Sequence, residues 1–132
     1  MNKVVSWVVV VAAIGGAYFW LSNAERKPAM IADVVVPEFS ALAANGEVVF
    51  QGTCAACHGA KLTGTENGPP LIHVAYRPAM HADYAFTLAI KNGVVAHHWR
   101  FGNMQPQPDI AEADIDPIII YIREMQRANG IE

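Results

Sequence analysis

The chain is poor in several residue types that small proteins use for stability or catalysis. Only two of its 132 residues are cysteines, too few for a disulfide framework that would compensate for a thin core. Charged residues amount to 16%, against about 25% in ordinary globular domains. No Ser/His/Asp or paired-carboxylate set stands out, so we do not expect an enzyme or a small-molecule substrate.

Basic residues are scarce as well. From Glu38 onward ten acidic side chains stand against six basic ones, Lys61, Arg77, Lys91, Arg100, Arg123 and Arg127. A domain with this balance is not expected to bind nucleic acid. Electrostatic steering toward a diffusing partner would be weak, which favours a protein held near its partners by a tether.

One long stretch has no charge at all. Residues 4–21 would form a helix about 27 Å long at ~1.5 Å per residue, close to the hydrocarbon thickness of a bilayer. Trp7 and Trp20 stand like interfacial anchors, and Lys3 marks a cytoplasmic N-terminus. We therefore expect residues 1–22 to be a single-pass anchor that contacts lipid through residues 4–21.

A cleaved export signal is the alternative, since residues 22–24 offer a small-x-small cleavage site. The apolar run exceeds the usual 7–15 residues of a signal core, which favours the anchor. Residues 23–37, with Pro28 and Pro37, read as a short linker. The remaining residues, 38–132, are expected to form one domain that either reading exports.

Cys54, Cys57 and His58 form the most specific motif of the chain. Two thiols at this spacing can each bond a haem vinyl group, and the following histidine can bind the iron. A dithiol redox pair would not need the histidine, and a zinc site would need further ligands such as a second cysteine pair. The motif therefore predicts covalent attachment of a c-type haem.

Around this motif, residues 40–126 resemble the class I monohaem cytochromes c. The resemblance is carried by Gly46-Glu47-Val48-Val49-Phe50, the motif at residues 54–58, Gly68-Pro69-Pro70-Leu71, Gly102-Asn103-Met104-Gln105-Pro106 and Tyr121-Ile122-Arg123. It implies an all-α fold of three to five helices around one covalently bound haem c, and a function in one-electron transfer. Because this family receives its haem outside the bacterial cytoplasmic membrane, it also implies a periplasmic haem domain.

His58 and Met104 are the expected iron ligands. His/Met ligation is usual in cytochromes c, and Met104 is flanked by a flexible Gly102 and a bracing Pro106. Met80 comes too early in the chain, and Met125 belongs to a helix face. Four histidines could also bind iron: His73, His81, His97 and His98.

Other residues are expected around the haem. In the family, a loop proline carbonyl accepts a hydrogen bond from the axial histidine; Pro69 or Pro70 could serve, and we assign Pro70. Trp99 and Arg100 offer N–H donors to a haem propionate.

Hydrophobic periodicity predicts three main helices. The first covers residues 38–51, with an apolar face of Phe39, Leu42, Val49 and Phe50. The resemblance to the cytochromes c implies that Gly46 lies at a close crossing with the last helix and that the Phe50 ring packs beside it. The second covers residues 82–92, with its aromatic residues in the core. The regular part of the last helix is expected to begin with Asp116 as its N-cap and Pro117 at its first position. This helix is expected to bury one face, which consists of Ile118, Tyr121, Ile122 and Met125.

The expected protein is a membrane-anchored, periplasm-facing electron carrier. It would pass single electrons between a quinol-oxidising complex or a dehydrogenase and a terminal oxidase, so its partners would be redox complexes at the membrane. Two alternatives remain open. One is a haem-based sensor or a metal-handling assembly factor that uses the histidine-rich segment, and the other is a fixed haem subunit of a larger oxidoreductase.

Overall fold

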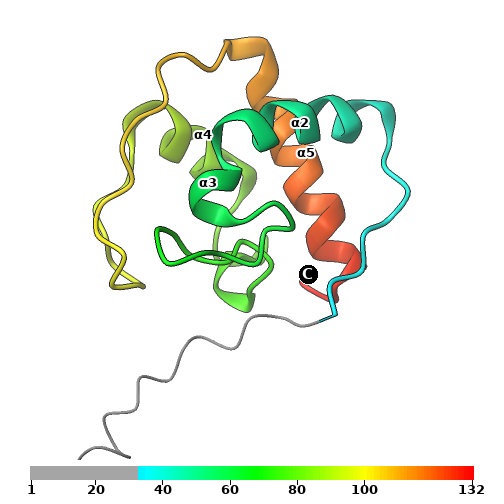
Figure 1. Cartoon of the computed structure of the whole chain (residues 1–132), viewed down its shortest axis with the longest axis horizontal. Helices are drawn as coiled ribbons and strands as arrows, with labels where there is room; N and C mark the ends of the chain where they lie inside the picture. Colours follow the sequence, from blue (N-terminus) through cyan, green and yellow to red (C-terminus); the bar gives the residue numbers. More distant parts are fainter. Residues whose placement is uncertain (1–32) are drawn as a thin grey trace, which may run out of the picture. The chain divides into compact units, whose positions relative to one another are not determined.

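The computed structural model describes residues 33–132, which form an all-α domain, as expected from the sequence (Figure 1). Its helices are α2 (Ala41–Thr53), α3 (Ala55–His58), the 3₁₀ helix η1 (Val74–Tyr76), α4 (Asp83–Asn92) and α5 (Glu112–Ala128). β-pairing in this part of the chain is limited to two isolated bridges, Thr65 with Gly68 and Val94 with Met104.

The expected membrane anchor lies outside the described residues, as does most of the expected linker. Within residues 33–132 no helix has the length and apolar character needed to cross a bilayer.

The crossing of α2 and α5 organises the core. Gly46 is buried there, and a Cβ atom on it would lie only 1.9 Å from the carbonyl oxygen of Pro117. One turn further along α2, the Phe50 ring lies 5.3 Å from the ring of Tyr121. The expectation of a small residue at the crossing, with an aromatic ring beside it, is confirmed.

Helix α2 begins at Ala41, three residues later than expected. Ser40 caps it, because its hydroxyl oxygen accepts a hydrogen bond from the Ala43 N–H at 3.2 Å. The Ser40 N–H and hydroxyl in turn donate to the Glu124 carboxylate of α5, at 3.0 and 2.7 Å. Leu42 is 54% exposed and does not belong to the core, which corrects its expected place on the apolar face.

Helix α5 begins at Glu112 and runs through Pro117, whereas the sequence indicated a start with Asp116 as cap. Proline removes one helical hydrogen bond, a cost of ~3 kcal/mol in a helix interior. Ile115 is only 3% exposed, so the turn before the proline is held by core packing, which offsets that cost. The expected buried face is confirmed, since none of its four members exceeds 3% exposure: Ile118, Tyr121, Ile122 and Met125.

Helix α4 presents Phe86 and Ile90 to the core, one helical turn apart. Tyr84 is 69% exposed, so the expectation that every aromatic residue of this helix lies in the core was wrong for Tyr84. Gly93 ends the helix with a φ of +73°, a conformation that glycine adopts at little cost.

A buried arginine connects α5 to the first residue of α4 and to the chain that precedes it. Arg123 is 6% exposed, and its Nε donates to Asp83 at 2.6 Å. The same guanidinium donates to the carbonyl oxygens of Tyr76 and His81 and lies 4.8 Å from the centre of the Phe86 ring. This set of contacts fixes the backbone around η1, where part of the site described below is built.

Candidate haem-binding site

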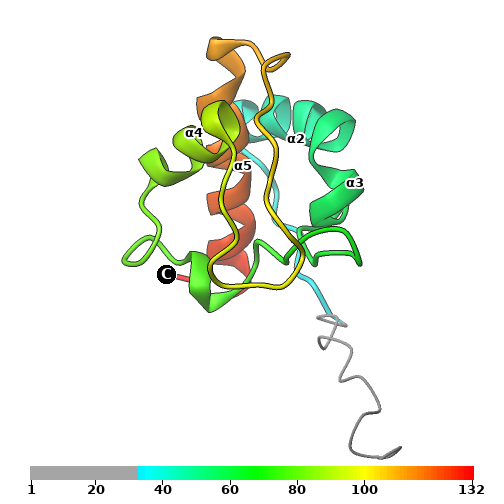
Figure 2. The same ribbon diagram turned by 90° about the vertical axis from the view of Figure 1, so that its left-hand side faces the viewer.

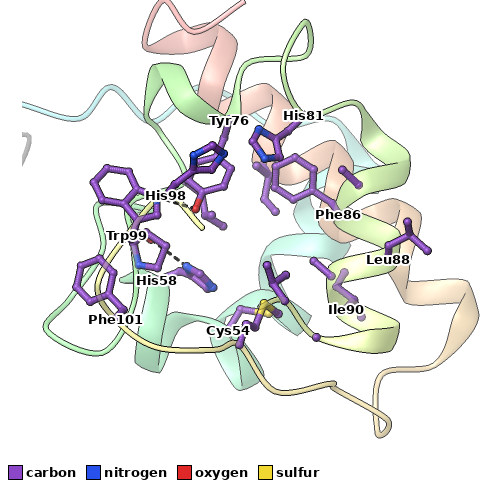
Figure 3. A pocket seen from close by; sticks show the side chains of 18 of the residues that line it. Cys54, His58, Tyr76, His81, Phe86, Leu88, Ile90, His98, Trp99 and Phe101 are labelled. Atoms are coloured by element: carbon purple, nitrogen blue, oxygen red, sulfur yellow. Dashed lines mark hydrogen bonds between the residues drawn. The ribbon is translucent and has the colours of Figure 1, made fainter. Parts of the chain in front are cut away.

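The helices enclose a cavity of about 370 Å³ (Figure 3). Helices α4 and α5 contribute apolar side chains to its wall: Phe86, Leu88, Ile90, Ile118 and Ile122. Helices α2 and α3 contribute Phe50 and His58, and Cys54 lines the cavity between them. A largely apolar cavity is suited to a flat hydrophobic group that completes a small core.

The two motif cysteines are free thiols, as required for bonds to a ligand. Cys54 lines the cavity, whereas Cys57 is exposed and is not part of the cavity wall. Burial, together with the neighbouring Cys57, raises the pKa of Cys54 to about 11. Redox-active dithiols have lowered thiol pKa values, so this environment does not support the dithiol alternative.

His58 has the protonation state that iron ligation requires. Its Nδ1–H donates to the carbonyl oxygen of Pro69 at 2.9 Å, which leaves Nε2 with a free lone pair. Burial lowers the pKa of His58 despite the opposing effect of this hydrogen bond, so the neutral ring is favoured.

The acceptor is therefore Pro69 and not Pro70, to which the sequence analysis assigned this contact. Gly68 packs against Cys57, and a Cβ atom on it would lie 3.0 Å from both Cβ and the carbonyl oxygen of that residue. The Thr65 hydroxyl holds the same loop by donating to the Cys57 carbonyl oxygen at 2.7 Å. With Gly68 held there, the next carbonyl along the chain is the one that reaches His58, and Pro70 does not line the cavity.

Met104 lines the same cavity as His58. The backbones of Met104 and Val94 exchange a pair of hydrogen bonds, with N–O distances of 3.0 and 2.9 Å. Figure 2 shows the two arms of the loop between α4 and α5 side by side. Gly93 permits this approach, because a Cβ atom there would lie 2.4 Å from the Met104 carbonyl oxygen. Met80 is 53% exposed and Met125 is buried in the core, and neither lines the cavity.

The expected propionate donors are placed differently from each other. Trp99 lines the cavity, and its indole N–H donates to the Tyr76 hydroxyl at 3.0 Å. Arg100 is exposed and is not part of the cavity wall. Tyr76, which no sequence motif singles out, also lines the cavity; burial raises its pKa, partly offset by the bond from Trp99. Tyr76 and Trp99 therefore form a pair of polar groups in an otherwise apolar wall.

Three of the four candidate histidines also line the cavity: His81, His97 and His98. His73 is not part of the wall, and its ring packs edge-on against Trp99 at 4.9 Å between centroids. Partial desolvation lowers the pKa of His98, and the neighbouring His97 and His81 lower it further.

A small helical domain with free motif thiols, a neutral histidine and a methionine around one apolar cavity defines a haem-binding module. The family model described as Cytochrome c matches residues 43–126, and the chain belongs to this family. No curated protein matched the chain, and no solved structure did.

The family implies a covalently bound haem c, and the residues present fit that group. Cys54 and Cys57 would hold it by thioether bonds, and His58 and Met104 could bind its iron from the cavity wall. When bound, this haem supplies reversible one-electron chemistry at the iron. The protein is accordingly a haem-based electron carrier.

Proposed function

We propose that the protein is a membrane-anchored, periplasm-facing monohaem cytochrome c. It carries single electrons between a quinol-oxidising complex or a dehydrogenase and a terminal oxidase. The observation that supports this role best is the common cavity of His58 and Met104, because a haem with both axial positions filled has no vacant site for a substrate.

The membrane location rests on the sequence. Residues 4–21 are free of charge and long enough to span a bilayer as a helix. The acidic balance of the domain offers little long-range electrostatic attraction to a partner. Attachment to the membrane that holds the partner complex would compensate, because it raises the effective concentration of the haem domain near that complex.

The test compares the full chain with a variant in which residues 1–32 are replaced by a cleavable export signal. The full chain should stay in the membrane fraction after a high-salt wash, and the variant should be released as a soluble haem protein. Respiration through the terminal oxidase should fall in cells that hold only the soluble form. Equal respiration, or a full chain that the salt wash removes, would contradict the anchored carrier.

A second measurement separates a carrier from a haem-based sensor. The reduced protein should resist carbon monoxide at concentrations that saturate a five-coordinate haem, because Met104 would occupy the sixth position. Rapid formation of a carbon monoxide complex in the wild-type protein would favour a sensor.

A further inference from the structure

Three histidines from two separate segments converge beside the cavity. His81 follows η1, whereas His97 and His98 belong to the loop between α4 and α5. One ligand nitrogen from each lies within 4.8 Å of the other two. The ring centroids of His97 and His98 are 4.3 Å apart, and those of His81 and His98 are 5.2 Å apart (His81 and His98 are labelled in Figure 3).

Two of these rings already make the backbone contact that metal-binding histidines usually make. The Nδ1–H of His81 donates to the Ala75 carbonyl oxygen at 2.6 Å, and that of His97 donates to the Val95 carbonyl oxygen at 2.8 Å. In the neutral ring, each bond leaves Nε2 unprotonated and free to bind an ion. Such a bond also fixes the orientation of the ring before the ion arrives.

His73 makes the opposite contact and serves as an internal comparison. Its Nδ1 accepts a hydrogen bond from the Ala75 N–H at 3.1 Å, so in the neutral ring the proton is on Nε2. The Ala75 backbone thus favours opposite tautomers of the two rings, with the proton on Nδ1 in His81 and on Nε2 in His73. His73 is not part of the cluster.

The backbone that carries the cluster is held independently of any ion. The Arg123 guanidinium donates to the His81 carbonyl oxygen from α5. On the other segment, the Ala96 N–H donates to the Asn103 side-chain oxygen at 3.0 Å, next to the bridge between Val94 and Met104. Preorganised ligands lose less freedom on binding and therefore bind more tightly.

No ion pair of the described residues holds the three imidazoles together. The two ion pairs of residues 33–132, Lys91 with Glu112 and Arg123 with Asp83, do not involve them. His97 and His98 are exposed, so an ion could enter from solvent and keep water in its remaining coordination positions.

We propose that His81, His97 and His98 form a site for one divalent transition-metal ion at the edge of the haem cavity. Three imidazole nitrogens suit Cu²⁺ and Zn²⁺, and the general order of affinities places Cu²⁺ first. The site is additional to the haem iron and does not depend on the partners or the location proposed above. A divalent charge so close to the haem favours the reduced haem, so binding of the ion raises the reduction potential.

The test uses the tag-free, haem-loaded protein after treatment with a chelator. Titration with Cu²⁺ or Zn²⁺, followed by calorimetry, should show one ion per chain. The electron paramagnetic resonance spectrum of bound Cu²⁺ should show coupling to imidazole nitrogens. His81→Gln, His97→Gln and His98→Gln should each weaken binding of the ion at least about tenfold. Loss of a residue that only hydrogen-bonds to a metal ligand already lowers metal affinity by about this much, and each of these variants removes a ligand itself.

His73→Gln is the matched control, because it removes a neighbouring histidine that does not belong to the cluster; it should retain wild-type affinity. Unchanged haem spectra in all four variants would show that the fold is intact. The proposal is overturned if the wild-type protein binds neither ion, or if the three cluster variants bind as the wild type does. It is also overturned if these variants shift the haem potential while the wild type binds no ion, since the histidines would then serve a propionate.

Discussion

At the scale of single residues, the site depends on a few side chains whose partners set their chemistry. His58 is a suitable iron ligand because burial favours its neutral ring and the hydrogen bond to the Pro69 carbonyl leaves Nε2 free. Three methionines follow the haem motif, and of these Met104 alone lines the cavity.

Met104→Ala should remove the sulfur ligand of the iron, lower the reduction potential and allow carbon monoxide to bind the reduced haem. The oxidised variant should lose the iron–sulfur charge-transfer absorption. Met80→Ala is the control, because its side chain is 53% exposed and lies outside the cavity wall, and it should behave as the wild type. Retention of the charge-transfer band in Met104→Ala would show that another group binds the iron.

Arg123 illustrates how a single buried residue can position several others. Arg123→Leu removes hydrogen bonds to Asp83 and to the Tyr76 and His81 carbonyl oxygens. We expect the free energy of unfolding to fall by about 3 kcal/mol, since hydrogen bonds to charged groups contribute roughly 1.5–3 kcal/mol each and solvent can compensate part of the loss. Urea denaturation of the haem-loaded protein measures this.

Arg127→Leu is the comparison for that experiment, because Arg127 is exposed on the same helix and should change stability by less than about 0.5 kcal/mol. Equal losses in the two variants would mean that the buried contacts of Arg123 contribute nothing specific.

At the scale of elements, the close approach of α2 and α5 determines the shape of the core next to the cavity. Phe50 of α2 and Ile118 and Ile122 of α5 line the cavity from this pair of helices. The distance between α2 and α5 therefore affects both the stability of the fold and the fit of the haem.

Gly46→Ala should force the two helices apart, because the new Cβ atom would lie 1.9 Å from the Pro117 carbonyl oxygen. Overpacking of this kind costs roughly 1–3 kcal/mol, and the contact with rigid backbone places the expected loss at the upper end. Urea unfolding and the haem absorption spectrum would both report the change. Gly52→Ala is a matched control in the same helix, where a Cβ atom meets nothing within 4 Å; it should be neutral or stabilise by up to about 1 kcal/mol. A Gly46→Ala variant as stable as this control would contradict the crossing.

At the scale of the whole molecule, the folded domain extends toward the N-terminus beyond residue 38. The side chain of Asn129 accepts from the Val35 N–H at 3.0 Å and donates to the Val35 carbonyl oxygen at 2.8 Å. Val34 and Phe39 pack against the core. The segment before α2 is thus attached to the end of α5.

Removal of residues 1–32 should leave the stability of the haem domain unchanged, whereas removal of residues 1–37 should lower it by about 1–3 kcal/mol. The second cut loses two hydrogen bonds, at about 0.5–1.5 kcal/mol each, and the packing of Val34. Thermal unfolding of the two truncated proteins, each exported with a cleavable signal, would measure the difference. Equal unfolding temperatures would show that residues 33–37 do not contribute.

The sequence by itself determined the features that depend on local spacing. Cys54, Cys57 and His58 indicate haem attachment because the chemistry needs only their order and separation. The buried face of α5 follows from helical periodicity, and the end of α4 at Gly93 follows from the backbone freedom of glycine.

Only the tertiary structure decided the features that depend on contacts between distant segments. It selected Pro69 over Pro70 because Gly68 packs against Cys57, and it kept Pro117 inside α5 because Ile115 is buried one turn earlier. It brought His81 to His97 and His98 and left His73 outside. Such choices follow from packing and hydrogen bonds across many residues of chain, and these leave no periodic or spaced pattern in the sequence.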